Sequence, residues 1–340
     1  MSRGTGPAMV QPAKGDAAGH LRVGVVGVGV MGSNHARVLT GLPDVRLVGV
    51  ADPDGHQANF VAKTLNIKAV RDVDALLDLG VDAVTIAAPT HFHHDIAITC
   101  IKRGVHVLVE KPIASNTEEG RRIVAAAHQA GVTLMIGHVE RFNPAVETIK
   151  EAIRGEKILS IGITRVGPFP PRMSNIGVVI DLAVHDIDLI RWFTDSEIVE
   201  VQPLLASAVA EREDIALLQF RTASGVLAQI NTNWLTPFKA RTVHVATREK
   251  YINADLLTRQ VTECFGFQPD GSYSMRHLSV GYSEPLRSEL VAFLSAIRDG
   301  SVPAVTGEEG VASLDIAMRC LAGHAPAQPA KRKTVKQAVG

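Results

Sequence analysis

The sequence predicts an α/β fold in which a doubly wound, parallel Rossmann sheet precedes an α+β domain with a mostly antiparallel sheet. Between residues 21 and 139, short apolar strands alternate with helical segments, which is typical of a parallel sheet covered by helices. After residue 140, a run of strands joined by turn residues favours antiparallel pairing. The chain of 340 residues is long enough for each domain to bury its own core.

The elements follow from these patterns in chain order. We expect a Rossmann domain at 21–139, a substrate-binding and oligomerisation domain at 140–325, and poorly ordered ends at 1–20 and 326–340. In the first domain the expected strands are 22–27, 45–51, 82–88, 105–110 and 132–137, and the helices 31–41, 55–65, 73–79, 93–103 and 117–130. In the second the expected helices are 144–154, 184–194, 284–299 and 308–322, and the strands 156–167, 198–207, 214–221, 225–234, 241–247 and 249–254.

Composition and charge exclude several classes of partner. Lys and Arg together number 35, as do Asp and Glu, so no net field attracts nucleic acid or an anionic membrane. Cys100, Cys264 and Cys320 lack C-x-x-C spacing, which argues against a disulfide framework and a structural zinc site. No apolar run approaches the roughly 20 residues that span a bilayer, and the N-terminal segment lacks the apolar middle of a signal peptide. We therefore expect a cytoplasmic protein with a small-molecule substrate.

The most informative motif is a glycine-rich turn at the start of the first domain. The strand RVGVVGVGVMG runs into a helix, and Gly27, Gly29 and Gly32 fill the G-x-G-x-x-G pattern. These glycines allow a tight turn, backbone approach to a pyrophosphate, and close packing of helix on strand. The amide groups of Val30 and Met31 lie at the positive end of the helix dipole, which favours phosphate. The pattern therefore predicts a dinucleotide-binding βαβ unit.

An acid ends the second strand of this unit. Asp52 follows VRLVGVA, at the position where a carboxylate accepts both ribose hydroxyls of the adenosine half of a dinucleotide. A 2′-phosphate would be repelled there. The expected cofactor is therefore NAD rather than NADP.

Polar residues follow several strands at their carboxyl ends, where ligands of doubly wound sheets bind. PTHFHHD follows the strand VTIAA, Glu110-Lys111-Pro112 follows HVLV, and GHVERFNP follows TLMI. In the second domain a helix begins with DLAVHDID, in which Asp181 and His185 have the i, i+4 spacing of one helical face.

These residues suit hydride transfer from a secondary alcohol to nicotinamide. The hydroxyl proton leaves as the hydride does, so a base must lie within about 3 Å of the oxygen, and His185 suits that role. Lys111 can stabilise the developing alkoxide. Asp181 can fix the histidine tautomer or temper the lysine.

Three nearby histidines, His91, His93 and His94, also raise the possibility of a metal site. Side chains so close in sequence point in different directions, and Asp95 is the only acid beside them. Hydride transfer needs no metal. We expect no metal site here and expect His93 to line the cofactor pocket.

Four motifs in order resemble the Gfo/Idh/MocA oxidoreductases, a family named after glucose-fructose oxidoreductase and inositol dehydrogenase. They are the glycine turn, the P-T-x-x-H stretch, the E-K-P triplet and the D-x-x-x-H helix, and the resemblance extends from Leu21 to about Ala322. It implies a Lys-Pro peptide bond that is often cis. It also implies a catalytic set of Lys111, Asp181 and His185, and a cofactor site that includes Pro89, Thr90, His93, Glu110 and Lys111.

Within this family, five stretches are similar to those of UDP-N-acetylglucosamine 3-dehydrogenases, which oxidise the sugar C3 hydroxyl to a ketone. They are GHVERFNPAV, RVGPFPPR, VVIDLAVHDID, NWLTP and VTGEEG. A nucleotide sugar is therefore the expected substrate. Arg141, Asn143 and Arg165 are candidate contacts, since a forked guanidinium suits a pyrophosphate, and Trp234 is a candidate to stack on the sugar or uracil.

Other interpretations of these residues remain open. Lys111 can be an ordinary exposed lysine, His185 a core histidine, Trp234 a core or interface aromatic, and Arg141 and Arg165 ion-pair partners. The alternative functions are action on a free or phosphorylated sugar or inositol, reduction of a 3-keto nucleotide sugar, and non-catalytic NAD-dependent regulation. Apolar strand residues, as in VLAQINTNW, also predict a homo-oligomer, a dimer or tetramer.

Overall fold

The computed structural model describes residues 15–170 and 176–322, and contacts divide the chain into two units. Among the described residues, the first unit takes 15–147 and 281–315, and the second takes 148–170, 176–280 and 316–322. The expected tail at 326–340, and most of the one at 1–20, lie outside the described residues.

The first unit is built on a six-stranded parallel sheet of order β3-β2-β1-β4-β5-β6. This order reverses between β1 and β4, which creates the switch point where doubly wound sheets bind ligands. The predicted Rossmann sheet is confirmed, with β3 as an additional strand that is too short to show a hydrophobic period. The strands are β1 (Leu21–Val26), β2 (Val45–Ala51), β3 (Lys68–Val70), β4 (Ala83–Ile86), β5 (His106–Glu110) and β6 (Leu134–Gly137).

The helices of this sheet lie within a few residues of the expected positions. Their apolar residues recur at helical spacing, as in α5, where Gly120, Ile123 and Ala127 are buried. The Asn116 side chain caps α5 by accepting a hydrogen bond of 2.9 Å from the Glu119 amide. The helices are α1 (Val30–Thr40), α2 (Gly55–Leu65), α3 (Val73–Leu77), α4 (His93–Lys102) and α5 (Thr117–Ala130), with 3-10 turns η1 (Thr90–Phe92) and η2 (Val139–Phe142).

The second unit contains an eight-stranded sheet of order β14-β13-β12-β11-β7-β10-β9-β8. Only the β7–β10 pair is parallel among the described strands of this sheet, so the expected mostly antiparallel sheet is confirmed. The strands are β7 (Ile158–Pro168), β8 (Ile198–Ala206), β9 (Ile215–Thr222), β10 (Leu227–Asn233), β11 (Leu235–Thr247), β12 (Lys250–Asp255), β13 (Gln260–Phe265) and β14 (Ser274–Leu278). Helix α7 (Val184–Thr194) belongs to the same unit, whereas helix α6 (Pro144–Ala152) begins in the first unit and ends in the second.

The strands of this sheet alternate between a buried and an open face. In β9, Ala216, Leu218 and Phe220 are buried, whereas Leu217 between them is exposed. Strands β13 and β14 were not expected, because QVTECF and SMRHL contain too few apolar residues to mark a strand clearly.

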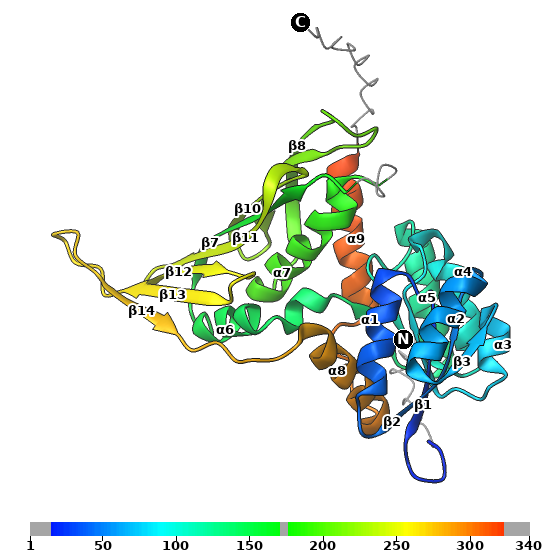
Figure 1. Cartoon of the computed structure of the whole chain (residues 1–340). Coiled ribbons are helices and arrows are strands. Elements are labelled where there is room, and N and C mark those ends of the chain that lie inside the picture. The colour runs from blue at the N-terminus through cyan, green and yellow to red at the C-terminus, as the bar shows by residue number, and fades with distance from the viewer. Residues whose placement is uncertain (1–14, 171–175, 323–340) are drawn as a thin grey trace, which may run out of the picture. The chain divides into compact units, whose positions relative to one another are not determined.

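Two helices differ from expectation in the unit to which they belong. We expected α8 (Pro285–Asp299) and α9 (Gly307–Leu321) in the second domain, but contacts place α8 and the first turns of α9 in the first unit. Helix α8 packs beside α1 (Figure 1) and against η2. A β-bridge joins Thr306 to Met135. The chain returns to its first unit after β14. The sequence pattern does not indicate this return, because it depends on contacts between segments that are distant in sequence.

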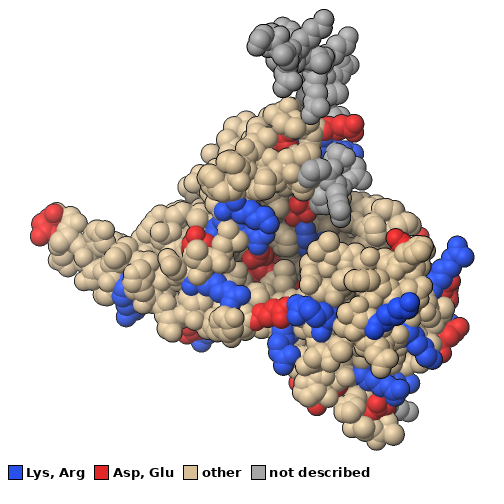
Figure 2. Space-filling view, viewed as in Figure 1, with Lys and Arg blue, Asp and Glu red and all other residues tan. Residues whose placement is uncertain are grey.

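Charged side chains of both signs are interspersed on the visible surface of each unit (Figure 2), as the equal totals of acidic and basic residues suggest. Across residues 15–170 and 176–322, no helix has the length and apolar character required to cross a membrane.

Candidate active site

The glycine turn between β1 and α1 separates two kinds of glycine. Gly27 has φ +81°, and a Cβ at Gly32 would lie 1.7 Å from the Gly27 carbonyl oxygen, so the fold itself excludes side chains at both positions. A Cβ at Gly29, by contrast, would meet nothing within 4 Å. The space in front of Gly29 is therefore open to a ligand, beside the N-terminal amides of α1 where Val30 is 77% exposed. This cradle fits the pyrophosphate of a dinucleotide.

Asp52 is oriented by the backbone of the same turn. Its Oδ2 accepts a hydrogen bond of 2.8 Å from the Val28 amide, and its Oδ1 accepts one of 2.8 Å from the Asp54 amide. A carboxylate has about four acceptor positions, so both oxygens retain capacity for ribose hydroxyls. Two supporting residues were not predicted from the sequence: Ser33 and Gln57, whose side chains donate to the Val28 carbonyl at 2.9 and 2.8 Å.

His93 joins the carboxyl ends of β4 and β5. It is 1% exposed, and its ring nitrogens lie 2.8 Å from the Ala88 carbonyl and 2.9 Å from the Pro112 carbonyl. Burial lowers the pKa of His93, against the opposing effect of these two carbonyls. The side chain thus holds together the segments that contain Pro89 and Thr90 on one strand end and Lys111 on the other. Its direct contact with the cofactor stays a prediction.

Glu110 ends β5 and is held by donors on two sides. Its Oε1 lies 2.9 Å from Nε2 of His35 on α1, and its Oε2 accepts a hydrogen bond of 3.2 Å from the Lys111 amide. Lys111 follows at the same edge of the sheet as the glycine turn, is half-buried, and precedes Pro112 through a cis peptide bond. The resemblance had implied this cis bond.

Asp181 and His185 lie in the second unit, and Lys111 lies in the first. Asp181 is in a π-helical turn, η3 (Val179–Ala183), and His185 is in the first turn of α7; both are half-buried. Single π-helical turns occur frequently at functional sites. The joint action of these two residues with Lys111 stays a prediction.

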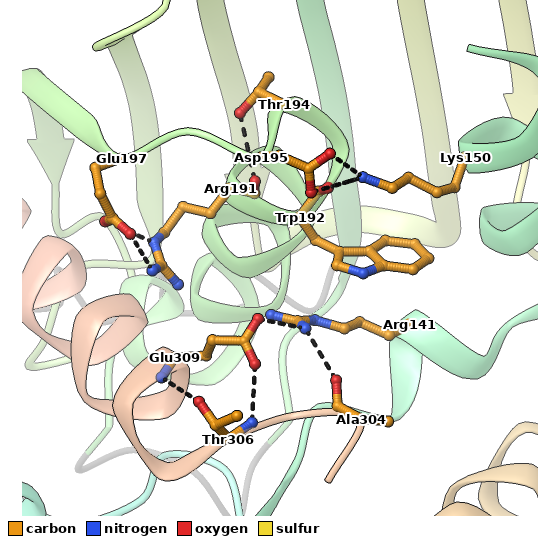
Figure 3. Close-up of polar contacts among 10 residues, drawn as sticks. All are labelled: Arg141, Lys150, Arg191, Trp192, Thr194, Asp195, Glu197, Ala304, Thr306 and Glu309. Atoms are coloured by element: carbon orange, nitrogen blue, oxygen red, sulfur yellow. Dashed lines mark hydrogen bonds and ion pairs between the residues drawn. The ribbon is translucent and has the colours of Figure 1, made fainter. Parts of the chain in front are cut away.

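Arg165 and Arg141 are buried in ion pairs. Arg165 is 2% exposed, and its guanidinium donates to both carboxylate oxygens of Asp186, at 2.7 to 3.0 Å. Arg141 is 4% exposed and contacts Glu309 at 2.7 Å and the Ala304 carbonyl at 3.3 Å (Figure 3). The ion-pair alternative therefore describes the positions of both, and their direct contact with substrate stays a prediction.

Trp234 and Asn143 also lie inside their units. Trp234 is 3% exposed and meets the Phe169 ring edge-on at a centroid distance of 5.9 Å, which fits a core aromatic. Asn143 is 7% exposed, and its side-chain oxygen accepts a hydrogen bond of 3.1 Å from the Ala145 amide. Their roles in substrate binding likewise stay predictions.

His35 and Glu289 were not predicted as site residues. His35 follows Gly32 by three positions on the face of α1 that packs inward, which was the available signal. Glu289 interrupts a helical apolar stripe formed by Leu286, Leu290 and Phe293, which was a second such signal.

The fold and the cradle at Gly29 define a dinucleotide-binding protein of the Rossmann class. Residues 21–138 match the family model described as oxidoreductase family, NAD-binding Rossmann fold, and residues 167–252 match the GFO/IDH/MocA C-terminal domain. The chain belongs to the Gfo/Idh/MocA family, and its cofactor is NAD.

Two relatives indicate the class of reaction. The chain is 34% identical over 238 residues to UDP-N-acetylglucosamine 3-dehydrogenase of Acidithiobacillus ferrooxidans, covering 70% of this chain and 75% of that one. It is 30% identical over 343 residues to inositol 2-dehydrogenase of Rubrobacter xylanophilus, covering 95% and 96%. A solved structure of the Acidithiobacillus enzyme superposes with a TM-score of 0.84 at 30% identity, covering 88% and 96%. The protein is therefore an NAD-dependent dehydrogenase of a family that acts on sugar alcohols.

The two kinds of glycine predict a separation of stability from cofactor binding. Gly29→Ala should leave the unfolding temperature within about 2 °C of the wild type, because its methyl group meets open space, yet weaken NAD binding at least about tenfold. Gly32→Ala should lower both the unfolding temperature and the affinity for NAD, because its methyl group meets the Gly27 carbonyl. Calorimetric titration and thermal unfolding check this expectation. A Gly29→Ala variant that binds NAD as the wild type does would contradict it.

Burial of His93 predicts a pH dependence of stability. Since its folded pKa lies below the unfolded value, the unfolded chain binds more protons below about pH 6.5, and wild-type stability falls as the pH falls. The neutral variant His93→Gln lacks this loss. The variant's free energy of unfolding, measured by chemical denaturation, should be lower than that of the wild type, and this difference should narrow by up to about 1.4 kcal/mol for each pH unit of acidification. A deficit that widens would mean that the two carbonyls hold an imidazolium.

Proposed function

We propose that the protein oxidises the C3 hydroxyl of UDP-N-acetylglucosamine to a ketone with NAD as the hydride acceptor. The observation that carries the chemistry is the position of Lys111 at the carboxyl edge of the sheet that also forms the dinucleotide cradle. Similarity in sequence and fold to a dehydrogenase of that name supports the choice of substrate.

Each proposed catalytic residue has a distinct task. NAD, when bound, supplies the acceptor for the hydride that leaves the sugar carbon. His185 takes the hydroxyl proton as general base, and Asp181 orients the imidazole. The Lys111 ammonium donates to the oxygen as negative charge develops on it. The reverse reaction, reduction of a 3-keto sugar, would use the same groups with the proton returned from His185.

A second candidate is oxidation of inositol or of a free or phosphorylated sugar. The similarity to an inositol 2-dehydrogenase extends over nearly the whole chain, at an identity close to that of the nucleotide-sugar enzyme. The ion pairs of Arg141 and Arg165 also weaken the argument that these residues hold a pyrophosphate.

We further propose a cytoplasmic homo-oligomer that forms through the open face of the second sheet. Leu204 on β8 and Leu217 on β9 are register partners and are 71% and 46% exposed, and Leu227 on β10 is 50% exposed. Association through this face would bury apolar surface that water otherwise covers.

A substrate panel distinguishes the candidates. Purified protein with NAD should form NADH from UDP-N-acetylglucosamine at least about a hundredfold faster, in kcat/KM, than from myo-inositol or glucose 6-phosphate. Absorbance at the NADH band measures this, with an aminotransferase present to remove the keto product. Turnover confined to inositol or the phosphorylated sugar would contradict the nucleotide-sugar assignment but keep the family chemistry.

Two variants test the catalytic roles on whichever substrate turns over. Lys111→Met and His185→Asn should each lower kcat by roughly a hundredfold or more, because each removes a group that acts in the transition state. The matched controls Lys102→Met and His277→Asn alter exposed residues of the same types and should leave kcat unchanged. Activity of Lys111→Met equal to that of the Lys102 control would remove the lysine from the mechanism.

A further inference from the structure

Glu289 is a fully buried acid on α8. Its neighbours along the buried face of the helix are Leu286, Leu290, Phe293 and Ile297, and Glu289 itself is 0% exposed. Neither of its carboxyl oxygens has a hydrogen-bond partner among the described residues. An ionised carboxylate without a partner in such surroundings carries a large desolvation cost.

The nearest titratable groups make a negative charge on Glu289 still more costly. One ligand-type atom each from His35 on α1, Glu110 on β5 and Glu289 all lie within 4.8 Å of one another. Glu110 is the member of this cluster that donors support, since it accepts from the Lys111 amide and pairs with the His35 ring. Two carboxylates at such a distance do not readily ionise together.

The charged groups of η2 and of the facing part of α1 are engaged elsewhere: Arg37 on α1 pairs with Glu284. The 3-10 turn η2 packs against α8 and carries Glu140 and Arg141. Arg141 pairs with Glu309, and Glu140 accepts from the Asn143 side chain at 3.4 Å. Burial and the Glu110 charge together raise the pKa of Glu289 well above its ordinary value.

We propose that Glu289 is a neutral carboxylic acid that limits the His35–Glu110–Glu289 cluster to a single negative charge, which resides on Glu110. In this role Glu289 is a positioning residue. A neutral Glu289 does not repel the Glu110 carboxylate. Glu110 therefore stays charged and accepts the hydrogen bond from the Lys111 amide, at the start of the Lys-Pro segment. This consequence for catalysis rests on the proposed function of Lys111, whereas the charge state of Glu289 does not.

A divalent cation is the alternative for these three residue types, whose ligand atoms lie close enough to share one, and the two interpretations make opposite predictions. A metal would require Glu289 as a charged ligand, so replacing Glu289 with a neutral residue would weaken metal binding and lower the stability of the protein. A neutral acid, in contrast, is mimicked by glutamine, which is uncharged and nearly the same size. The substitution Glu289→Gln therefore separates the two.

The experiment compares unfolding of the wild type, Glu289→Gln and the control Glu249→Gln, an exposed glutamate, across pH. The unfolded wild-type chain releases the Glu289 proton above its ordinary pKa of 4.5, while the folded chain retains it, so folding becomes less favourable as the pH rises. The glutamine variant has no such loss. The ratio of its folding equilibrium constant to that of the wild type should therefore rise by up to about tenfold per pH unit between about pH 5 and pH 8.

Infrared spectroscopy supplies a second readout that space filling alone would not change. The wild type near neutral pH should show the C=O stretch of a protonated carboxyl group, and Glu289→Gln should lack it. Three results would each overturn the proposal. The first is a lower stability of Glu289→Gln than of the wild type at pH 8, and the second is a stability difference between them that does not change with pH. The third is an unfolding temperature that Zn²⁺ or Mn²⁺ raises in the wild type but not in Glu289→Gln. None of these measurements requires turnover, so their failure is distinguishable from failure of the proposed function.

Discussion

The contact between Gly32 and the Gly27 carbonyl is the constraint on which the rest of the site depends. Because a methyl group at Gly32 would lie 1.7 Å from that oxygen, α1 packs directly on the turn that follows β1. This packing aims the first amides of the helix into the space in front of Gly29 and presents the Val28 amide to Asp52. Backbone geometry, rather than a charged side chain, thus prepares the place of the pyrophosphate.

The same helix connects the cofactor turn to the proposed catalytic lysine. His35 lies one turn beyond Gly32 and contacts Glu110, and Glu110 accepts a hydrogen bond from the Lys111 amide. His93 completes the framework by joining the ends of β4 and β5. Within the first unit, the dinucleotide cradle and Lys111 are therefore parts of one hydrogen-bonded framework, and its rigidity suits a reaction in which the hydride donor and acceptor must be held in register.

Sequence predicted those features that local pattern controls. The period of the apolar residues indicated both sheets, and the spacing of Gly27, Gly29 and Gly32 indicated the turn, because these signals lie within a few residues of one another. The return of α8 to the first unit and the ion pair of Arg165 with Asp186 depend on segments distant in sequence. The cluster of Glu289 with His35 and Glu110 also joins segments distant in sequence, although the interruption of the apolar stripe of α8 by Glu289 is visible locally.

The proposed reaction moves a hydride from C3 of a nucleotide sugar to NAD, and isotope transfer tests this step most directly. UDP-N-acetylglucosamine deuterated at C3 would be incubated with the protein and NAD, and the NADH formed would be examined by nuclear magnetic resonance. We expect one deuterium at C4 of the nicotinamide ring in each molecule of NADH. NADH that forms without deuterium, or no NADH from this sugar under conditions in which inositol is oxidised, would contradict the claim.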